Sequence, residues 1–521
     1  MKQISLKSSF LIFFVLSLFS SLNAQVLGTC GLTPEDGHLL IDRLEANRRS
    51  SDIDYRSEDL VYIPVKYHLV ADKKGENYFD RMDRVFESLC KLNESYGEVG
   101  LSFYLKGIRQ SILYDVKNDQ VFTNPKLPLS ARLLSSVTSR NKDAVNIYVV
   151  DKIGSDGNGG VVLGYYTGAG DYVVMAKTEI SNRKSTLAHE LGHFFTLPHP
   201  FFGWESNTYD PNKPTPQFIQ YGNAQVRVEY VSQDKKANGT KICEISADRI
   251  CDTRASYKLG FGYGQCEYKG NAKDPDGVLL EPTLQERNYM SYFLRCSNYS
   301  FTPQQGEAMI KDFNSSKRNY LRPNYQPLKE APGEIVISEP TDESQLSYFD
   351  YVLLDWEDAE NTQLYFVELA RNKSFTKSYS SFYTEESQLE LSDLNPNNKY
   401  YWRVTPFNET HFCERPSSTI QFRTGDWSTA TKDIDGLLNW AIYKNPVLAN
   451  ESVSLIFNSD KILELDLSII DLTGKQIVRQ RIELNNQENR IDIQAALNPG
   501  TYIIHIRGDE GVSSKKLTVI K

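Results

Sequence analysis

The segment His189-Glu190-Leu191-Gly192-His193, followed by His199, carries the residues best suited to chemistry. On a helix, positions i and i+4 lie on one face about one turn apart, so His189 and His193 can face one metal ion. Three protein ligands with one open position are typical of catalytic zinc. Glu190 lies beside the first histidine, where a carboxylate can polarise a metal-bound water. The spacing predicts Zn²⁺ bound by His189, His193 and His199, with Glu190 as general base.

The flanking residues predict a helix that ends before the third histidine. Pro198 forbids a helix that continues to His199. The offset of His199 is that of the pattern H-E-x-x-H-x-x-G-x-x-H of metzincins, which argues against a solvated helix with satisfied histidines. Thr196 stands where that pattern has glycine. Glycine reaches positive φ at no steric cost and a β-branched residue does not, so either the turn differs or Thr196 is strained.

A second segment, Asn288-Tyr289-Met290-Ser291-Tyr292, lies further along the chain. Metzincins carry a tight turn with a methionine below the zinc site, and Met290 is one of only five methionines here. Taken alone, Met290 is equally compatible with an ordinary core residue. Tyr292 is the candidate for a hydroxyl that stabilises the oxyanion. We therefore expect Met290 below the metal and Tyr292 as a second catalytic residue beside Glu190.

Together these segments resemble the pappalysin (cytophagalysin) family of metzincin proteases over about residues 62–322. Further matching residues are Ile63–His68, Arg249–Thr253 and Phe301–Gln305. The resemblance implies an α+β catalytic domain, with a mixed sheet ahead of the zinc helix, and protein or peptide substrates. It also implies Ca²⁺ as a second cofactor, in a region where Ala247 and Arg254 replace a glycine and a proline of the family.

The chain has seven cysteines, four of which lie close together in the second half of this region. Four cysteines allow three pairings, and spacing does not choose among them. The resemblance implies that these four form two bridges; they are Cys243, Cys251, Cys266 and Cys296. Cys90 lies in a helical pattern and is expected to be a buried thiol, whereas Cys413 falls in another domain.

Cys30, which precedes Gly31, is a candidate cysteine switch. Related proenzymes use such a Cys-Gly to fill the open zinc position, and thiolate sulfur binds zinc readily. An unpaired N-terminal thiol is the equally weighted alternative, and a lipoprotein signal at Leu27–Cys30 is a weaker one. Arg48-Arg49-Ser50-Ser51 is either an activation site or a solvated loop.

The start of the chain has the pattern of a secretory signal. Met1–Ala24 has two lysines ahead of the apolar run Phe10–Phe19, which is too short to span a bilayer. We therefore expect a mature protein without a transmembrane helix. The net charge of -9 is spread along the chain with no basic cluster, so no nucleic-acid partner is expected.

With 521 residues, the chain should hold several domains. Beyond the proline-rich linker Pro323–Pro332 the pattern changes to short strands. Leu394-Asn395-Pro396 followed by Tyr400 resembles the tyrosine corner of a fibronectin type III domain. The end of the chain, including Asp471–Lys475 and Pro499–Ile503, resembles the C-terminal sorting domain of the type IX secretion system. A second ordinary β-sandwich is the alternative for this segment.

The expected architecture is therefore an α+β metzincin-like catalytic domain followed by two all-β sandwich domains. The expected parts are a signal peptide (1–24), a pro-segment (25–57), the zinc protease domain (58–325), the fibronectin type III-like domain (333–425) and the sorting domain (437–521). The sorting domain implies the type IX machinery as partner. It also implies a secreted or cell-surface location, after export through the periplasm and the outer membrane.

These observations predict a secreted zinc endopeptidase that uses metal-activated water. The competing interpretation is a secreted adhesin or binding protein with an inert protease core, for which Thr196 is the best support. The intact Glu190 argues against it. A zinc hydrolase acting on other amides is also compatible with the motif.

Overall fold

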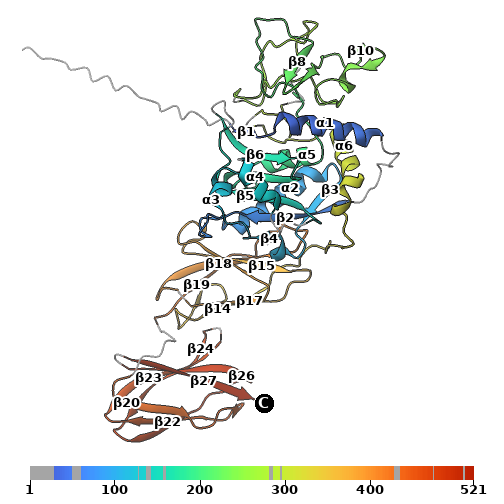
Figure 1. Cartoon of the computed structure of the whole chain (residues 1–521). Coiled ribbons are helices and arrows are strands. Elements are labelled where there is room, and N and C mark those ends of the chain that lie inside the picture. The colour runs from blue at the N-terminus through green and yellow to red at the C-terminus, as the bar shows by residue number, and fades with distance from the viewer. Residues whose placement is uncertain are drawn as a thin grey trace, which may run out of the picture.

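The structure is a computed structural model of the chain (Figure 1). It describes residues 28–49, 60–126, 128–136, 142–155, 160–263, 265–280, 286–293, 296–392, 394–426, 434–472, 474–508 and 511–521. The expected signal peptide, and Ser50 and Ser51 of the candidate activation site, lie outside the described residues.

The first part of the chain is built on a seven-stranded mixed sheet with strand order β1-β6-β7-β5-β2-β3, in which β4 pairs with β2. The strands are β1 (Gly28–Cys30), β2 (Val61–Leu69), β3 (Leu101–Tyr104), β4 (Ile112–Leu113), β5 (Val145–Val150), β6 (Val161–Thr167) and β7 (Tyr172–Ala176). β6 is antiparallel to β7, and the other pairs are parallel. The continuous apolar run of β5 is buried along its whole length, as its sequence predicts.

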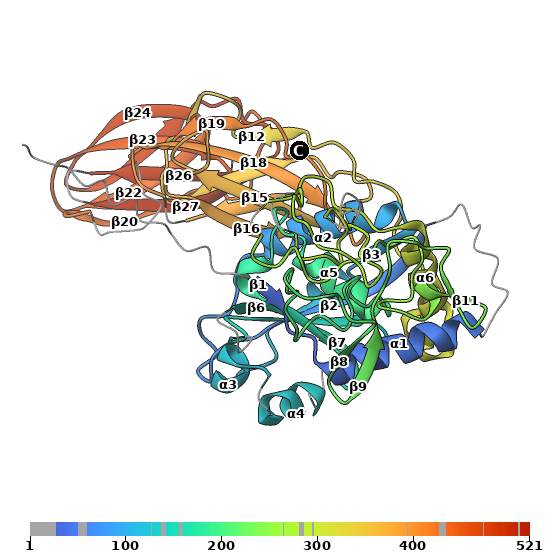
Figure 2. The same ribbon diagram turned by 90° about the horizontal axis from the view of Figure 1, so that it is seen from above.

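Helices cover this sheet (Figure 2). The α-helices are α1 (Pro34–Arg49), α2 (Met82–Gly97), α3 (Asp119–Thr123), α4 (Pro128–Ser136), α5 (Thr186–Phe194) and α6 (Pro303–Asn314). Short 3₁₀ turns are η1 (Ile108–Ser111), η2 (Lys177–Glu179), η3 (Ile242–Glu244) and η4 (Ser316–Leu321). Apolar side chains of α2 and α5 share one core with the sheet, among them Phe86, Leu89 and Leu191. This core holds α5, the histidine helix, against the sheet.

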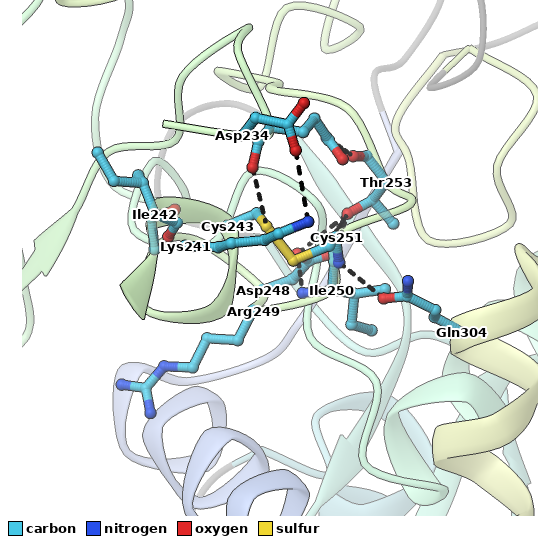
Figure 3. Close-up of a disulfide and its surroundings, with 12 residues drawn as sticks. Asp234, Lys241, Ile242, Cys243, Asp248, Arg249, Ile250, Cys251, Thr253 and Gln304 are labelled. Atoms are coloured by element: carbon cyan, nitrogen blue, oxygen red, sulfur yellow. Dashed lines mark hydrogen bonds and ion pairs between the residues drawn. A yellow bond between two sulfur atoms is a disulfide. The ribbon is translucent and has the colours of Figure 1, made fainter. Parts of the chain in front are cut away.

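Residues 200–263 and 265–280 form an irregular lobe beyond α5, at the top of Figure 1. Its hairpins are β8 (Phe218–Tyr221) with β9 (Ala224–Arg227), and β10 (Lys236–Ala237) with β11 (Thr240–Lys241). Disulfides join Cys243 to Cys251 and Cys266 to Cys296, so two bridges form among the four cysteines as expected. The Cys243–Cys251 bridge lies close to Asp248 and Thr253 (Figure 3).

The next part is a β-sandwich of a three-stranded sheet (β12-β14-β17) and a five-stranded sheet (β13-β19-β18-β15-β16). Its strands are β12 (Ile337–Glu339), β13 (Ser344–Gln345), β14 (Val352–Trp356), β15 (Leu364–Ala370), β16 (Ser380–Thr384), β17 (Gln388–Leu391), β18 (Lys399–Phe407) and β19 (Ile420–Arg423). Trp356 and Trp402 fill its core. The Tyr400 hydroxyl accepts a hydrogen bond from the Asn395 N–H at 2.9 Å, which is the predicted tyrosine corner.

The C-terminal part is a second sandwich, with sheets β20-β22-β25 and β21-β27-β26-β23-β24. Its strands are β20 (Leu437–Ile442), β21 (Val447–Leu448), β22 (Val453–Ser459), β23 (Leu463–Asp471), β24 (Gln476–Leu484), β25 (Glu488–Ile493), β26 (Gly500–Arg507) and β27 (Val512–Ile520). The predicted hairpin turn joins β23 to β24, and Asp471 accepts hydrogen bonds from Gly474 and Lys475.

The first sandwich is bonded covalently to the α+β part, which corrects one expectation. Cys90 is not a buried thiol but forms a disulfide with Cys413, 323 residues away. Cys90 does lie in a helix, α2, as predicted, but the face of α2 that carries Cys90 packs against the sandwich. The Phe86 ring packs there against Phe407 and Phe412, with ring centroids 4.7 and 5.6 Å apart. The two parts therefore share a hydrophobic core as well as a bridge.

Among the described residues, no helix combines the length and apolar character that a bilayer crossing needs.

Candidate metal centre

The three predicted histidine ligands converge on one point, two of them from α5 and the third from the loop that follows it. The Nε2 atoms are 3.1 Å (His189 to His193), 3.2 Å (His193 to His199) and 3.3 Å (His189 to His199) apart. Zinc–nitrogen bonds of about 2.0–2.1 Å in a tetrahedral arrangement separate ligand nitrogens by roughly 3.3–3.4 Å. The triangle of nitrogens thus has the size that a single zinc ion requires.

Each imidazole is oriented through its other nitrogen. Nδ1 of His189 lies 2.7 Å from the Tyr289 carbonyl oxygen, and Nδ1 of His193 lies 2.7 Å from that of Leu197. A carbonyl only accepts, so both rings carry hydrogen on Nδ1 and leave an Nε2 lone pair for a metal. Burial lowers the pKa of His189 to about 4 and that of His193 well below its ordinary value, so both rings are neutral at neutral pH.

The third ring is held by a carboxyl group. Nδ1 of His199 lies 3.0 Å from Oε1 of Glu205, a residue that sequence reasoning missed. Burial lowers the pKa of His199 and raises the pKa of Glu205 to about 8. Glu205 has no motif to mark it, and the only signal in the sequence is a carboxylate shortly after a ligand.

Glu190 lies fully buried between α5 and the strand above it. Its side chain packs against Gly164 of β6, where an added Cβ would come within 2.9 Å of the Glu190 Cγ. Burial raises the pKa of Glu190 to about 8. A carboxyl group with a pKa near neutrality can accept and return a proton, which suits a general base.

Cys30, at the end of β1, lies next to the three histidines and Glu190. Its strand, β1, pairs with β6, and its sulfur lies within 4.8 Å of the ligand atoms of all three histidines. The Cys30 thiol also donates to Oε2 of Glu190 at 3.4 Å, and burial together with the Glu190 charge raises the pKa of that thiol. The sulfur is thus positioned as a fourth ligand to the metal that the histidines could hold.

Gly31 lets the chain after Cys30 approach β6 closely. The Gly31 N–H donates to the Gly164 carbonyl at 2.9 Å, and the Lys126 ammonium donates to the Gly31 carbonyl at 3.0 Å. An added Cβ on Gly31 would lie only 2.8 Å from Val162, so a larger residue would push the segment away.

Tyr292 and Met290 also lie at the site. The Tyr292 hydroxyl accepts a hydrogen bond from the Cys30 N–H at 3.2 Å, and its ring centroid is 5.0 Å from that of His199. Burial raises the pKa of Tyr292, which keeps its hydroxyl protonated and able to donate. Met290 is fully buried, and its sulfur lies where a Cβ on Gly192 would stand, directly below the histidine helix.

The turn before His199 uses the left-handed backbone that the motif glycine would supply. Thr196 has φ +72°, is fully buried, and its hydroxyl has no hydrogen-bond partner among the described residues. The sequence left two alternatives, a turn of different geometry or a strained Thr196, and the structure shows the strained threonine.

The region implied to bind calcium contains two buried acids. Asp248 accepts hydrogen bonds from the Thr253 hydroxyl and the Ile250 N–H (Figure 3). Neither carboxylate oxygen of the nearby buried Glu229 has a hydrogen-bond partner within the described chain, and burial raises the pKa of both acids. The Glu229 carboxylate, buried without a donor, is the group here that suits a hard cation such as Ca²⁺. Asp252 instead caps α6, accepting from the Thr302 hydroxyl.

Two small cavities flank Cys30. One of about 130 Å³ touches Lys126, Lys258 and Tyr221. The other, of about 90 Å³, touches Ser185, Thr186 and Phe293. Thr29 and Cys30 line both, so this segment of the N-terminal region lies in the middle of a cleft over the metal site.

Comparison with solved structures yields partial matches to fibronectin-type modules. They are the FN1–FN3 domains of chicken CNTN1, the fibronectin(III)-like modules of Clostridium thermocellum CbhA and a two-domain fibronectin type III segment of chicken tenascin. Identities are 13, 13 and 14%, with 37, 36 and 36% of this chain and 66, 93 and 99% of those chains covered. TM-scores of 0.18, 0.15 and 0.14 are too low to support an argument.

No curated relative matches the sequence. Residues 441–521 match the family described as a secretion system C-terminal sorting domain. This match confirms the sorting domain of the type IX system expected from the sequence. The chain is therefore exported to the cell surface or the medium, and its C-terminal segment interacts with the secretion machinery.

Proposed function

We propose that the chain is the latent precursor of a secreted zinc endopeptidase. The observation that carries this proposal is the triangle of Nε2 atoms of His189, His193 and His199. All three sides are 3.1–3.3 Å, and each ring is anchored through Nδ1. Glu190 next to this triangle, with a pKa near 8, supplies the acid–base group that peptide hydrolysis needs.

Zn²⁺ held by the three histidines would supply a Lewis acid that lowers the pKa of water towards neutrality. The Glu190 carboxylate accepts the proton of the attacking water and returns it to the leaving amine nitrogen. The Tyr292 hydroxyl, kept protonated by burial, donates a hydrogen bond to the oxygen of the tetrahedral intermediate. In the precursor the same hydroxyl accepts a hydrogen bond from the Cys30 N–H, so the backbone of β1 lies against the group that would face the substrate.

Latency follows from the position of β1. Cys30 fills the space between the three imidazoles and the Glu190 carboxylate, and β1 occupies the edge of β6. An extended substrate would pair with that edge by strand addition once β1 leaves. Helix α1, which follows β1, belongs to the same removable segment.

Calcium is part of the proposal as a structural ion. Glu229 and Asp248 would hold the ion, and its charge would neutralise these two acids. They lie in the lobe that contains two disulfides. Removal of calcium should loosen that lobe without removing zinc.

The test combines metal analysis with peptide cleavage by purified protein after removal of the pro-segment. We expect one zinc per chain, cleavage abolished by a zinc chelator, and a Glu190→Ala variant that keeps zinc and loses cleavage. Glu244→Ala, which removes an exposed carboxylate, is the matched control and should cleave normally. A metal-free wild type, or a zinc-loaded wild type that cleaves no peptide, would favour the adhesin interpretation instead.

A further inference from the structure

The three histidines differ in what orients their rings. His189 and His193 lie on α5 and are held by backbone carbonyls, which the fold fixes. His199 lies in the loop after Pro198, outside any helix or strand, and is the one ring held by an ionisable side chain. A loop residue has more freedom than a helical one, so the third ligand depends most on its anchor.

That anchor, Glu205, is itself held firmly. Its Oε2 atom accepts a hydrogen bond from the Gly203 N–H at 2.7 Å, while Oε1 faces His199. Gly203 has φ +100°, a backbone conformation that glycine adopts freely, and a Cβ there would meet Ile219 and Val226 at 3.0 Å. The Glu205 side chain is 11% exposed and that of His199 is 1% exposed, so little water competes for this contact.

The His199 ring is also fixed in its plane. It stacks on Phe201 with centroids 4.6 Å apart and planes 8° apart. Stacking is equally compatible with a ring turned over by half a turn about the Cβ–Cγ bond, and the contact of Nδ1 with Glu205 selects one of these two orientations. The two contacts together direct Nε2 to the point shared with His189 and His193.

We infer that Glu205 is a positioning residue of the metal centre: its carboxylate fixes the His199 ring and strengthens Nε2 as a zinc ligand. The inference rests on the proposed function. With a metal on Nε2, the imidazole hydrogen stays on Nδ1 and is donated to Oε1 of Glu205. A carboxylate in this place raises the basicity of the ligand more than the carbonyls behind the other two histidines do.

The test measures zinc affinity by chelator competition on the full chain and compares Glu205→Ala, Glu205→Gln and Glu205→Asp with wild type. Loss of such a partner costs about 10–100-fold in metal affinity. We expect that loss for Glu205→Ala. Glu205→Gln should lose less, because its amide oxygen still accepts from Nδ1, and Glu205→Asp should recover part of the affinity. Glu244→Gln is the control for removing a carboxylate elsewhere in the same lobe, at an exposed position.

Two further readouts separate positioning from general stability. The visible spectrum of the cobalt-substituted protein reports ligand geometry and should shift in Glu205→Ala, and the thermal midpoint of the metal-free protein measures any general loss of stability. Equal zinc affinity in Glu205→Ala and wild type would overturn the inference. So would an affinity loss that a fall in metal-free stability fully explains. A wild type that binds no zinc would instead overturn the proposed function, so the two failures are distinguishable.

Discussion

The sulfur of Cys30 lies 3.4 Å from Oε2 of Glu190, so the candidate inhibitor touches the candidate base as well as the space between the histidines. In the proposed enzyme, one side chain would therefore block both components that hydrolysis needs, the open metal position and the proton acceptor. The surrounding contacts of Gly31 and Tyr292 hold the sulfur in place.

Replacement of Cys30 by serine should activate the uncut precursor. A hydroxyl is a weaker zinc ligand than a thiolate, so the pro-segment should bind less tightly. If the pro-segment binds the site about 1.4 kcal/mol more weakly, the fraction of precursor with an open site rises about tenfold. Cleavage of a short peptide by precursor that gels show to be uncut is the measurement. A Cys30→Ser precursor as silent as wild type would show that the thiol is a bystander.

Helix α1 is held against the rest of the α+β part by buried polar contacts that lie away from the candidate metal centre. Buried Arg43 donates to the Tyr166 hydroxyl at 2.5 Å and to the Gly168 carbonyl at 3.2 Å, and Asn47 donates to Asp312 at 3.0 Å. Loss of such a buried partner costs about 1–3 kcal/mol. Arg43→Ala should therefore speed proteolytic removal of the pro-segment. Asp42→Ala, which removes an exposed side chain of the same helix, is the matched control and should behave as wild type. Equal removal rates for both variants would count against this attachment.

Glycine at position 196 should stabilise the protein. Threonine in the left-handed region costs roughly 1–2 kcal/mol, and its buried hydroxyl has no partner among the described residues. These gains exceed the entropy cost of glycine, about 0.5–1 kcal/mol. The thermal midpoint of Thr196→Gly should rise. Thr196→Ala keeps Cβ and hence the strain, so it should gain less, and a reverse order would exclude strain as the cause.

Acid should weaken the contact between Asp171 and Arg318. Burial opposes ionisation of Asp171, but the Arg318 guanidinium 2.6 Å away lowers its pKa below the ordinary value. A carboxyl group with a lowered folded-state pKa contributes stability above its unfolded pKa of about 3.9, and this is lost as pH falls through the folded value. Asp171→Asn should unfold earlier near neutral pH but depend less on pH below about 4. Parallel pH curves for variant and wild type would contradict this assignment.

The bridge between Cys90 and Cys413 should stabilise the junction of the α+β part and the first sandwich. Native disulfides of this kind contribute about 2–4 kcal/mol. Cys413→Ser should lower the unfolding midpoint of both parts together, because they share the Phe86 core. The double variant with Cys90→Ser should be no worse than either single one, since all remove the same bond. Additive losses would mean that the thiols act separately.

Local pattern was sufficient for some of these features and not for others. His189, His193 and Met290 follow from helix spacing and a turn, which short segments specify. The contact of Cys30 with Glu190 requires β1 to pair with β6 at the edge of the sheet. Residue spacing does not predict this pairing, and only the family resemblance suggested a role for Cys30. For Cys90 the helix was predicted correctly but the expected buried thiol was wrong, because its disulfide partner Cys413 lies in a different part of the chain. Glu205 and Glu229 escaped notice because isolated glutamates carry no periodic signal.

The disulfide between Cys90 of α2 and Cys413 of the first sandwich changes the consequence of proteolytic cleavage between these two parts of the chain. The stretch 323–332 contains no helix or strand, and a protease could enter there. Two fragments produced by such a cut would still migrate as one species until a reductant is added. In an oxidising medium, nicking at this stretch would therefore release neither half.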